Sequence, residues 1–177
     1  RPDARRPPKG PLMPHAHDTR IVPHGAAQMF DLVADIRRYP EFLPWCKALR
    51  VRSEETDEQG RGLVTADMVA RFKGFEERFT TRVTLDKPNL AIDVAYIDGP
   101  FKRLINAWRF QPLVSGSRVD FDIDFEFRSR VLQLLAKTMM EKALLKLSEA
   151  FVQRADALYA APLTCSAASS RPEPPST

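Results

Sequence analysis

The sequence has few of the residues that form covalent crosslinks. Its 177 residues include 2 cysteines, and one of them, Cys165, lies in a C-terminal stretch rich in proline and serine. Cys46 has no CxxC partner and no histidine beside it, so we expect it to pack as a small apolar side chain. The sequence therefore predicts no structural disulfide, which is typical of a reducing, cytoplasmic compartment.

Long apolar runs are absent as well. No run approaches the roughly 18 residues that a membrane-spanning helix needs. The first residues carry no apolar core of the kind found in secretory signal peptides, so we do not expect secretion.

Catalytic and metal-binding motifs are also missing. We find no Gly-rich phosphate loop, no nucleophile elbow and no paired-cysteine motif. His15 and His17 would share one face of a strand, but no cysteine or carboxylate cluster with metal-ligand spacing lies near them. The sequence thus predicts no metal site and no catalytic residue, although polar residues dispersed inside a cavity would escape a search for motifs.

Excess positive charge is confined to one end of the chain. The formal net charge is +4, of which residues 1–12 supply +3 and residues 162–177 supply none, so residues 13–161 carry only +1. An almost neutral domain is weak evidence for a nucleic-acid partner.

The chain divides into three segments by composition. Residues 1–12 are rich in proline and arginine, and neither they nor residues 162–177 have enough apolar side chains to order themselves. We predict a disordered extension over 1–12, one folded domain over 13–161 and a disordered tail over 162–177. A domain of this length can bury a sizeable core.

Periodicity gives the order of elements within the domain. Apolar residues at helical spacing predict helices, and alternating apolar and polar residues predict strands. A strand over 15–22 precedes a helix over 25–35 and a short helix or turn over 37–43, broken around Pro40 and Pro44. Further strands are predicted over 48–55, 63–72, 75–85, 91–97, 104–111 and 119–127.

The last strand and the last helix have the clearest patterns. From Val119 to Phe127, five apolar residues alternate with four acidic residues, so one face is buried and the acidic face meets water. From about Arg130 to about Tyr159, apolar residues recur every three or four positions, which predicts an amphipathic helix about 45 Å long.

These elements predict an α+β fold. The long C-terminal helix must pack on the apolar face of a curved antiparallel sheet of about seven strands, with two short helices after the first strand. A strongly twisted sheet curls, and a curled sheet over one rod-like helix leaves space between them. We therefore expect an apolar cavity for a lipid-like ligand.

Three segments resemble one known family. Residues 39–46, YPEFLPWC, resemble the YPxFLPWC signature of the coenzyme Q-binding START-like proteins. Residues 99–104, GPFKRL, followed by 108–110, WRF, and the alternating segment 122–127 match the same family. This family belongs to the polyketide cyclase/START superfamily, which also contains ribosome-association toxins, and the resemblance covers about residues 14–160.

The resemblance implies a helix-grip fold, in agreement with the order of elements above. It implies that ubiquinone (coenzyme Q) or a similar isoprenoid lipid is a bound ligand and not a catalytic cofactor. It further implies a non-catalytic carrier or chaperone that supports respiratory electron transport, in the cytoplasm or at the inner face of the respiratory membrane. Two alternatives stay open: a toxin-like protein that binds the large ribosomal subunit, and a polyketide cyclase or aromatase. The sequence predicts no oligomeric state.

Large apolar side chains at inward-facing positions are the candidate lining of the cavity. Ordinary core packing is the alternative for each one, and the resemblance favours a cavity for the set. The candidates are Phe42, Trp45, Met68, Phe79, Tyr96, Trp108, Phe110, Phe121, Ile123, Phe125 and Met139.

Two proline-containing loops are candidates for transient contact with a membrane surface. Pro44 stiffens the first loop. In the second, Pro100 is expected to break a strand and expose Phe101 beside Lys102 and Arg103. An apolar tip flanked by cations suits an anionic membrane surface. The alternatives are a lid over the cavity and an ordinary hairpin loop.

Overall fold

The structure is a computed structural model that describes residues 15–160. The predicted tails, residues 1–12 and 162–177, and Cys165 lie outside the described residues, so the predicted division into segments stays a prediction. The strands are β1 (His15–Val22), β2 (Cys46–Thr56), β3 (Arg61–Phe72), β4 (Phe75–Asp86), β5 (Ala91–Asp98), β6 (Phe101–Leu113) and β7 (Gly116–Phe127). The helices are α1 (Ala26–Ala34), α2 (Tyr39–Phe42) and α3 (Arg130–Tyr159), with short 3-10 helices at Ile36–Arg38 and Lys87–Asn89.

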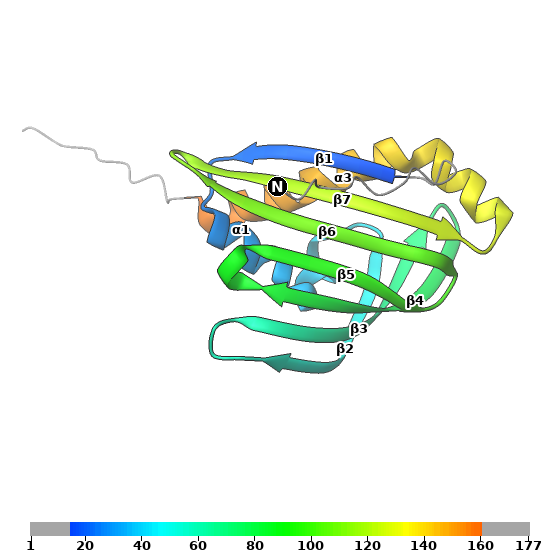
Figure 1. The fold of residues 1–177 in the computed structure, drawn as a ribbon. Coiled ribbons are helices and arrows are strands. Elements are labelled where there is room, and N and C mark those ends of the chain that lie inside the picture. The colour runs from blue at the N-terminus through cyan, green and yellow to red at the C-terminus, as the bar shows by residue number, and fades with distance from the viewer. Residues whose placement is uncertain (1–14, 161–177) are drawn as a thin grey trace, which may run out of the picture.

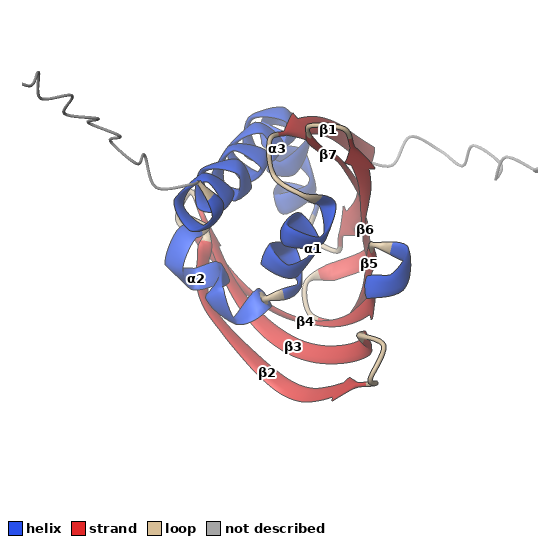
Figure 2. Ribbon diagram, turned by 90° about the vertical axis from the view of Figure 1, so that its left-hand side faces the viewer, coloured by secondary structure: helices blue, strands red, loops and turns tan. Residues whose placement is uncertain are grey.

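The strands form one antiparallel sheet in the order β1-β7-β6-β5-β4-β3-β2. Figure 2 shows the sheet curling around the three helices, which all lie on its concave side. Figure 1 shows α3 running along the sheet near β1 and β7. The predicted α+β helix-grip fold is confirmed, including the bounds of the last helix. None of the helices within 15–160 is long and apolar enough to cross a membrane.

One end of the concave side is filled by a tightly packed core. The apolar face of α1 supplies Met29 and Val33, which are 2% and 1% exposed. They pack with Ile92 of β5 and with Phe151 and Ala155 from the second half of α3. These fully buried contacts fix the helices against the sheet at this end of the molecule.

The same end holds α3 by polar contacts. The Ser148 hydroxyl donates a hydrogen bond to Asp18 of β1. His24 Nε2 lies 2.6 Å from Asp156 Oδ1, and Arg154 lies 2.9 Å from a carboxylate oxygen of Glu41. All of these α3 residues lie beyond position 147. In the first half of the helix, the Gln133 side chain accepts a hydrogen bond from the backbone N–H of Phe127 at 2.7 Å, where β7 leads into α3.

The first half of α3 is packed differently. Within this helix, the residues that are fully buried are Ser148, Phe151 and Ala155, all in its second half. In the first half, Val131 and Leu134 are 61% and 65% exposed, and the residues turned toward the sheet are half-buried. The first half therefore lies over a space and not against a packed layer.

Candidate ligand-binding cavity

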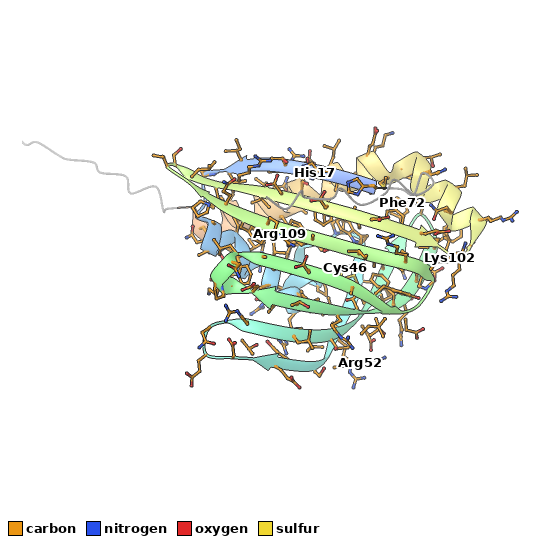
Figure 3. All side chains as sticks on the ribbon, in the orientation of Figure 1. His17, Cys46, Arg52, Phe72, Lys102 and Arg109 are labelled. Carbon is orange, nitrogen blue, oxygen red and sulfur yellow. The ribbon has the colours of Figure 1, made fainter. Side chains whose placement is uncertain are left out.

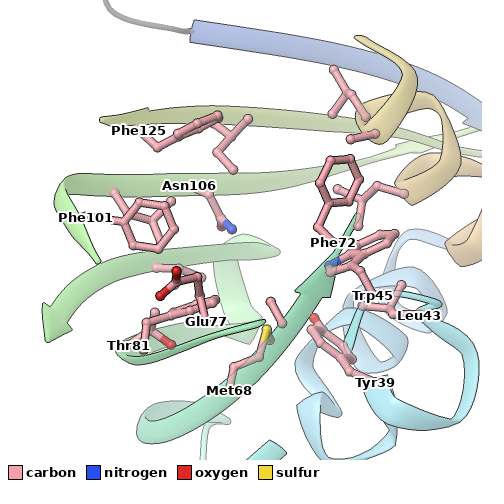
Figure 4. A pocket seen from close by; sticks show the side chains of 18 of the residues that line it. Tyr39, Leu43, Trp45, Met68, Phe72, Glu77, Thr81, Phe101, Asn106 and Phe125 are labelled. Carbon is pink, nitrogen blue, oxygen red and sulfur yellow. The ribbon is translucent and has the colours of Figure 1, made fainter. Parts of the chain in front are cut away.

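A cavity of about 390 Å³ lies between the concave face of the sheet and the first half of α3. Its walls come from strands β2 to β7, from α3 and from the segment around α2. Figure 4 shows side chains of these elements pointing into it from several sides. A volume of this size falls in the range of small-molecule sites.

Most of the predicted lining residues lie on this cavity. Trp45 and Met139 approach from the helical side, and the others belong to strands. The predicted residues that line it are Trp45, Met68, Phe79, Trp108, Phe121, Ile123, Phe125 and Met139.

Three predicted lining residues are not among those that line this cavity. Phe110 is 4% exposed and packs edge-on against Phe30 of α1, because its row of the sheet lies under that helix. Phe42 packs against Phe151 with ring centroids 5.3 Å apart, in the end of the molecule where α3 is fastened. Tyr96 packs edge-on against Phe101, with ring centroids 5.6 Å apart, and Phe101 is the ring of this pair that lines the cavity.

Phe101 also departs from the prediction, which placed it at an exposed loop tip. It is 7% exposed, lines the cavity and stacks on Phe127 at 4.4 Å. The reason is the turn before it: Gly99 has φ +136°, and an added Cβ there would lie 2.6 Å from the Cβ of Phe79. That close approach brings the start of β6 under β4 and turns Phe101 inward. Its half-buried neighbour Pro100 accepts a backbone hydrogen bond from Arg128 at 2.9 Å.

The two cations after Phe101 are exposed, as expected, but they are paired. Lys102, which Figure 3 labels, lies 2.9 Å from Glu126, and Arg103 lies 2.9 Å from Asp124. The acidic stripe of β7 is thus neutralised across the strands, and farther along it His17 contacts Asp122 at 2.8 Å. The region 99–103 therefore does not form the predicted apolar tip flanked by free cations.

The YPEFLPWC segment joins the core to the cavity. The Tyr39 hydroxyl donates a hydrogen bond to the Val33 carbonyl at 2.6 Å, and burial raises the pKa of this tyrosine. Pro44 is exposed, while Trp45 is half-buried and lines the cavity. Cys46 is 4% exposed, as predicted for a packed thiol, and burial raises its pKa to about 11.

The rim of the cavity was missed by the sequence analysis. Phe72 and Phe75, on either side of the β3–β4 turn, are 39% and 40% exposed and line the cavity together with Leu132 and Leu135 of α3. Figure 3 shows Phe72 at the end of β3 that approaches α3. The turn residues between the two phenylalanines carry positive φ angles, which fits a two-residue hairpin.

Polar lining residues were missed as well. Asn106 on β6 and Glu77 and Thr81 on β4 point into the cavity (Figure 4). The signal for Asn106 was present, because it occupies an inward position of the alternating β6 pattern, two residues before Trp108. Across residues 15–160, no three His, Cys, Asp or Glu side chains are grouped so that they could hold a metal ion.

The curled sheet, the long helix and the apolar cavity between them together define a START-like, helix-grip cavity protein. Comparison with known families agrees: residues 22–152 match the family described as polyketide cyclase / dehydrase and lipid transport. The chain belongs to this family.

Known relatives and solved structures lie within the same superfamily. The ribosome association toxin RatA of Escherichia coli K12 is 36% identical over 151 residues, which are 85% of this chain and 92% of that protein. The coenzyme Q-binding protein COQ10 homolog B of Xenopus laevis is 28% identical over 147 residues, 80% of this chain and 58% of that protein.

Two solved structures show the same fold. The 18 kDa protein CC1736 of Caulobacter crescentus superposes with a TM-score of 0.72 at 37% identity, covering 84% of this chain and all of that one. A START superfamily protein of Mycobacterium smegmatis superposes with a TM-score of 0.70 at 20% identity, covering 81% and 98%.

Proposed function

We propose that this protein binds ubiquinone or a similar isoprenoid lipid in the cavity and carries it without transforming it. The observation that supports the proposal is the apolar cavity between the sheet and the first half of α3, which is open at its rim. An isoprenoid tail gains free energy from burial at roughly 25 cal/mol per Å² of apolar surface. Aromatic and thioether side chains such as Phe125 and Met139 suit a long branched tail, because they adapt to irregular shapes.

The named ligand comes from a relative. The Xenopus protein is called coenzyme Q-binding, and we extend that ligand to this chain because the resemblance covers the signature segment that supplies Trp45 to the cavity wall. A carrier role that supports respiratory electron transport is part of the same proposal.

Binding without catalysis is also a proposal. Ionisable side chains on the wall within residues 15–160 are Tyr39, Glu77 and Lys146. The tyrosine hydroxyl is bonded to a backbone carbonyl, and acid–base catalysis needs a positioned proton donor or acceptor near the reacting atom. A cyclase or aromatase activity would require the other two to act on a bound polyketide-like substrate.

In this proposal, the residues at the rim of the cavity contact the membrane. Phe72 and Phe75 on the hairpin, and Val131 and Leu134 in the first turns of α3, are exposed apolar side chains beside the cavity. Lys73 lies between the two phenylalanines in the sequence. Such a surface can rest on the headgroup region of an anionic bilayer while a lipid is exchanged.

The test of ligand binding uses the two tryptophans. The chain has 2 tryptophans, and both line the cavity, so a bound quinone should quench their fluorescence. Organic extracts of the purified protein should also contain a quinone by mass spectrometry. Folded, delipidated protein that shows no saturable quenching with ubiquinone analogues would contradict the proposal.

Ribosome association is a second candidate function, and one structural observation favours it. Arg50 on β2 and Arg78 and Arg82 on β4 lie exposed on the outer face of the sheet, on the two strands that flank β3, and none of the three forms an ion pair within 4 Å with a residue in 15–160. Free arginines on one face can contact the phosphates of RNA. The RatA relative is named for ribosome association.

Co-sedimentation with large ribosomal subunits tests this second function. Changing Arg78 and Arg82 to Gln should lower binding and reduce its salt dependence, because an arginine that binds a phosphate releases counterions and a glutamine does not. Arg109→Gln is the matched control, since Arg109 is already paired with Asp93 at 2.8 Å. Association that is absent, or equal for all variants, would remove this candidate.

A further inference from the structure

One polar side chain interrupts the apolar wall of the cavity. Asn106 lies on the inward face of β6 between Leu104 and Trp108, and its side chain points into the cavity (Figure 4). Its cross-strand neighbours are Val94 of β5 and Ile123 of β7, whose side chains cannot form hydrogen bonds. Its Oδ1 atom is buried and has no hydrogen-bond partner in the described part of the chain.

Three other buried side-chain oxygens in the described part of the chain lack a hydrogen-bond partner and can be compared with Oδ1 of Asn106. Among residues 15–160 they belong to Asp86, Asp124 and Tyr96. The two carboxylates form ion pairs with arginines, so their charge is compensated. Tyr96 is on the inward face of β5, next to the strand that carries Asn106. The uncharged oxygens without a partner therefore gather on two neighbouring strands beside the cavity.

A second polar group lies on β4, which is separated from the strand of Asn106 by β5. Thr81 of β4 is the cross-strand partner of Tyr96, is 7% exposed and lines the cavity. Buried polar groups in folded proteins are almost always hydrogen-bonded. A carboxamide and a hydroxyl on the wall of an apolar space are therefore placed to bond to something that enters it.

We infer that Asn106, with Thr81, is the recognition site for the polar end of the ligand. This inference rests on the proposed function and adds the position and chemistry of the head group. A carboxamide donates through Nδ2 and accepts through Oδ1, and a hydroxyl does both. The matching ligand end is a ring or chain terminus that carries carbonyl or hydroxyl oxygens, while the rest of the ligand contacts the apolar wall.

The experiment compares a ligand that has a head group with one that has none. Ubiquinone with a two-isoprene tail and squalene, an isoprenoid hydrocarbon, are each used to displace a fluorescent apolar dye from the delipidated full chain. Asn106→Leu keeps the branching at Cγ and removes both hydrogen-bonding groups. We expect it to weaken ubiquinone binding about tenfold, the effect of removing one hydrogen bond, and to change squalene binding less than about twofold.

Two further variants keep the result interpretable. Thr81→Val should weaken ubiquinone selectively, by about two- to fivefold for a neutral hydrogen bond. Thr84→Val is its matched control, because Thr84 lies on the same strand at an exposed position outside the cavity. The melting temperature of Asn106→Leu should equal or exceed that of the unchanged chain, because a buried oxygen without a partner is removed.

Each outcome bears on a different claim. Selective loss of ubiquinone binding in Asn106→Leu and Thr81→Val supports the head-group site. Equal weakening of both probes, or no weakening, overturns the head-group site and leaves lipid binding standing. An unchanged chain that binds neither probe overturns the proposed function and the head-group site together.

Discussion

The two halves of α3 carry the same repeat of apolar residues every three or four positions but have different surroundings. In the second half, Phe151 and Ala155 are 3% and 0% exposed and pack in the core, and Phe151 also borders the cavity. In the first half, Leu135 and Met139 face the sheet but line the cavity. One half is an anchor, and the other is one wall of a binding site.

This comparison shows that helical periodicity predicts which side of a helix faces the sheet. It does not predict whether protein side chains or a cavity lie between the helix and the sheet. The anchor is fixed by the shape of its neighbours: Phe151 meets the rings of Tyr39, Phe42 and Trp108 at 5.1 to 5.5 Å. Edge-to-face contacts of this kind require defined positions. No comparable aromatic contact holds the first half of α3 within residues 15–160, so a ligand can replace protein atoms there.

The largest expected difference between the halves is in stability. Phe151→Ala should lower the free energy of unfolding by about 3–5 kcal/mol, because it opens a hole in a packed core. Met139→Ala should cost under about 1 kcal/mol, because its side chain faces an existing space. Urea denaturation of both delipidated variants measures the difference, and equal costs would contradict the division of the helix.

A charge in the wall should affect ligand binding and leave the fold intact. Met139→Asp places a carboxylate in an apolar site, so we expect affinity for a ubiquinone analogue to fall more than tenfold. Thr138→Asp is the control, because Thr138 is the preceding residue of the helix and is exposed. Tryptophan quenching measures both, and a similar loss in the two variants would mean that charge on the helix, and not its position, matters.

A smaller effect is expected on the pH dependence of stability, through the contact between Ser148 of α3 and Asp18 of β1. Burial by itself would raise the pKa of Asp18, but hydrogen bonds from Ser148 and Arg20 outweigh it and hold the pKa below its usual value of 3.8. A carboxylate with a lowered pKa stabilises the fold above its unfolded-state pKa, and that stability is lost as the pH falls through the folded-state value.

Ser148→Ala should therefore cost about 1–2 kcal/mol near pH 7, the usual contribution of a hydrogen bond to a charged group after allowance for partial exposure. The cost should shrink as the pH falls below the usual carboxyl value of 3.8 and Asp18 becomes protonated. Unfolding of the variant and the unchanged chain over a series of acidic pH values checks this, and a cost that does not change with pH would contradict it.

Much of the fold could be predicted from the sequence, because its patterns are local. The alternation from Val119 to Phe127 and the helical repeat after Arg130 predicted elements that the structure confirms. The cavity was expected from the topology and the family resemblance. The residues that line the cavity could be predicted only in part. A period of two shows which side chains face inward, but it does not show whether they lie under the cavity or under a packed helix. Phe110 and Trp108 share a face, yet Phe110 lies under α1.

Positions that depend on distant contacts could not be predicted. Phe101 is buried because Gly99 approaches Phe79 on another strand, which no local pattern reports. The pairing of Lys102 and Arg103 with the acidic stripe depends on the β6–β7 register. Asn106 was within reach, because a polar residue at an inward position of an apolar strand is a signal in itself.

Hydrogen exchange along α3, measured with and without a ubiquinone analogue, tests the central claim most directly. In the free protein, amides in residues 148–159 should exchange much more slowly than those in 131–147, because packing on the core suppresses local opening. Adding the analogue should slow exchange in 131–147 and leave 148–159 nearly unchanged. Uniform protection along the helix, with no change on addition of the analogue, would contradict the account.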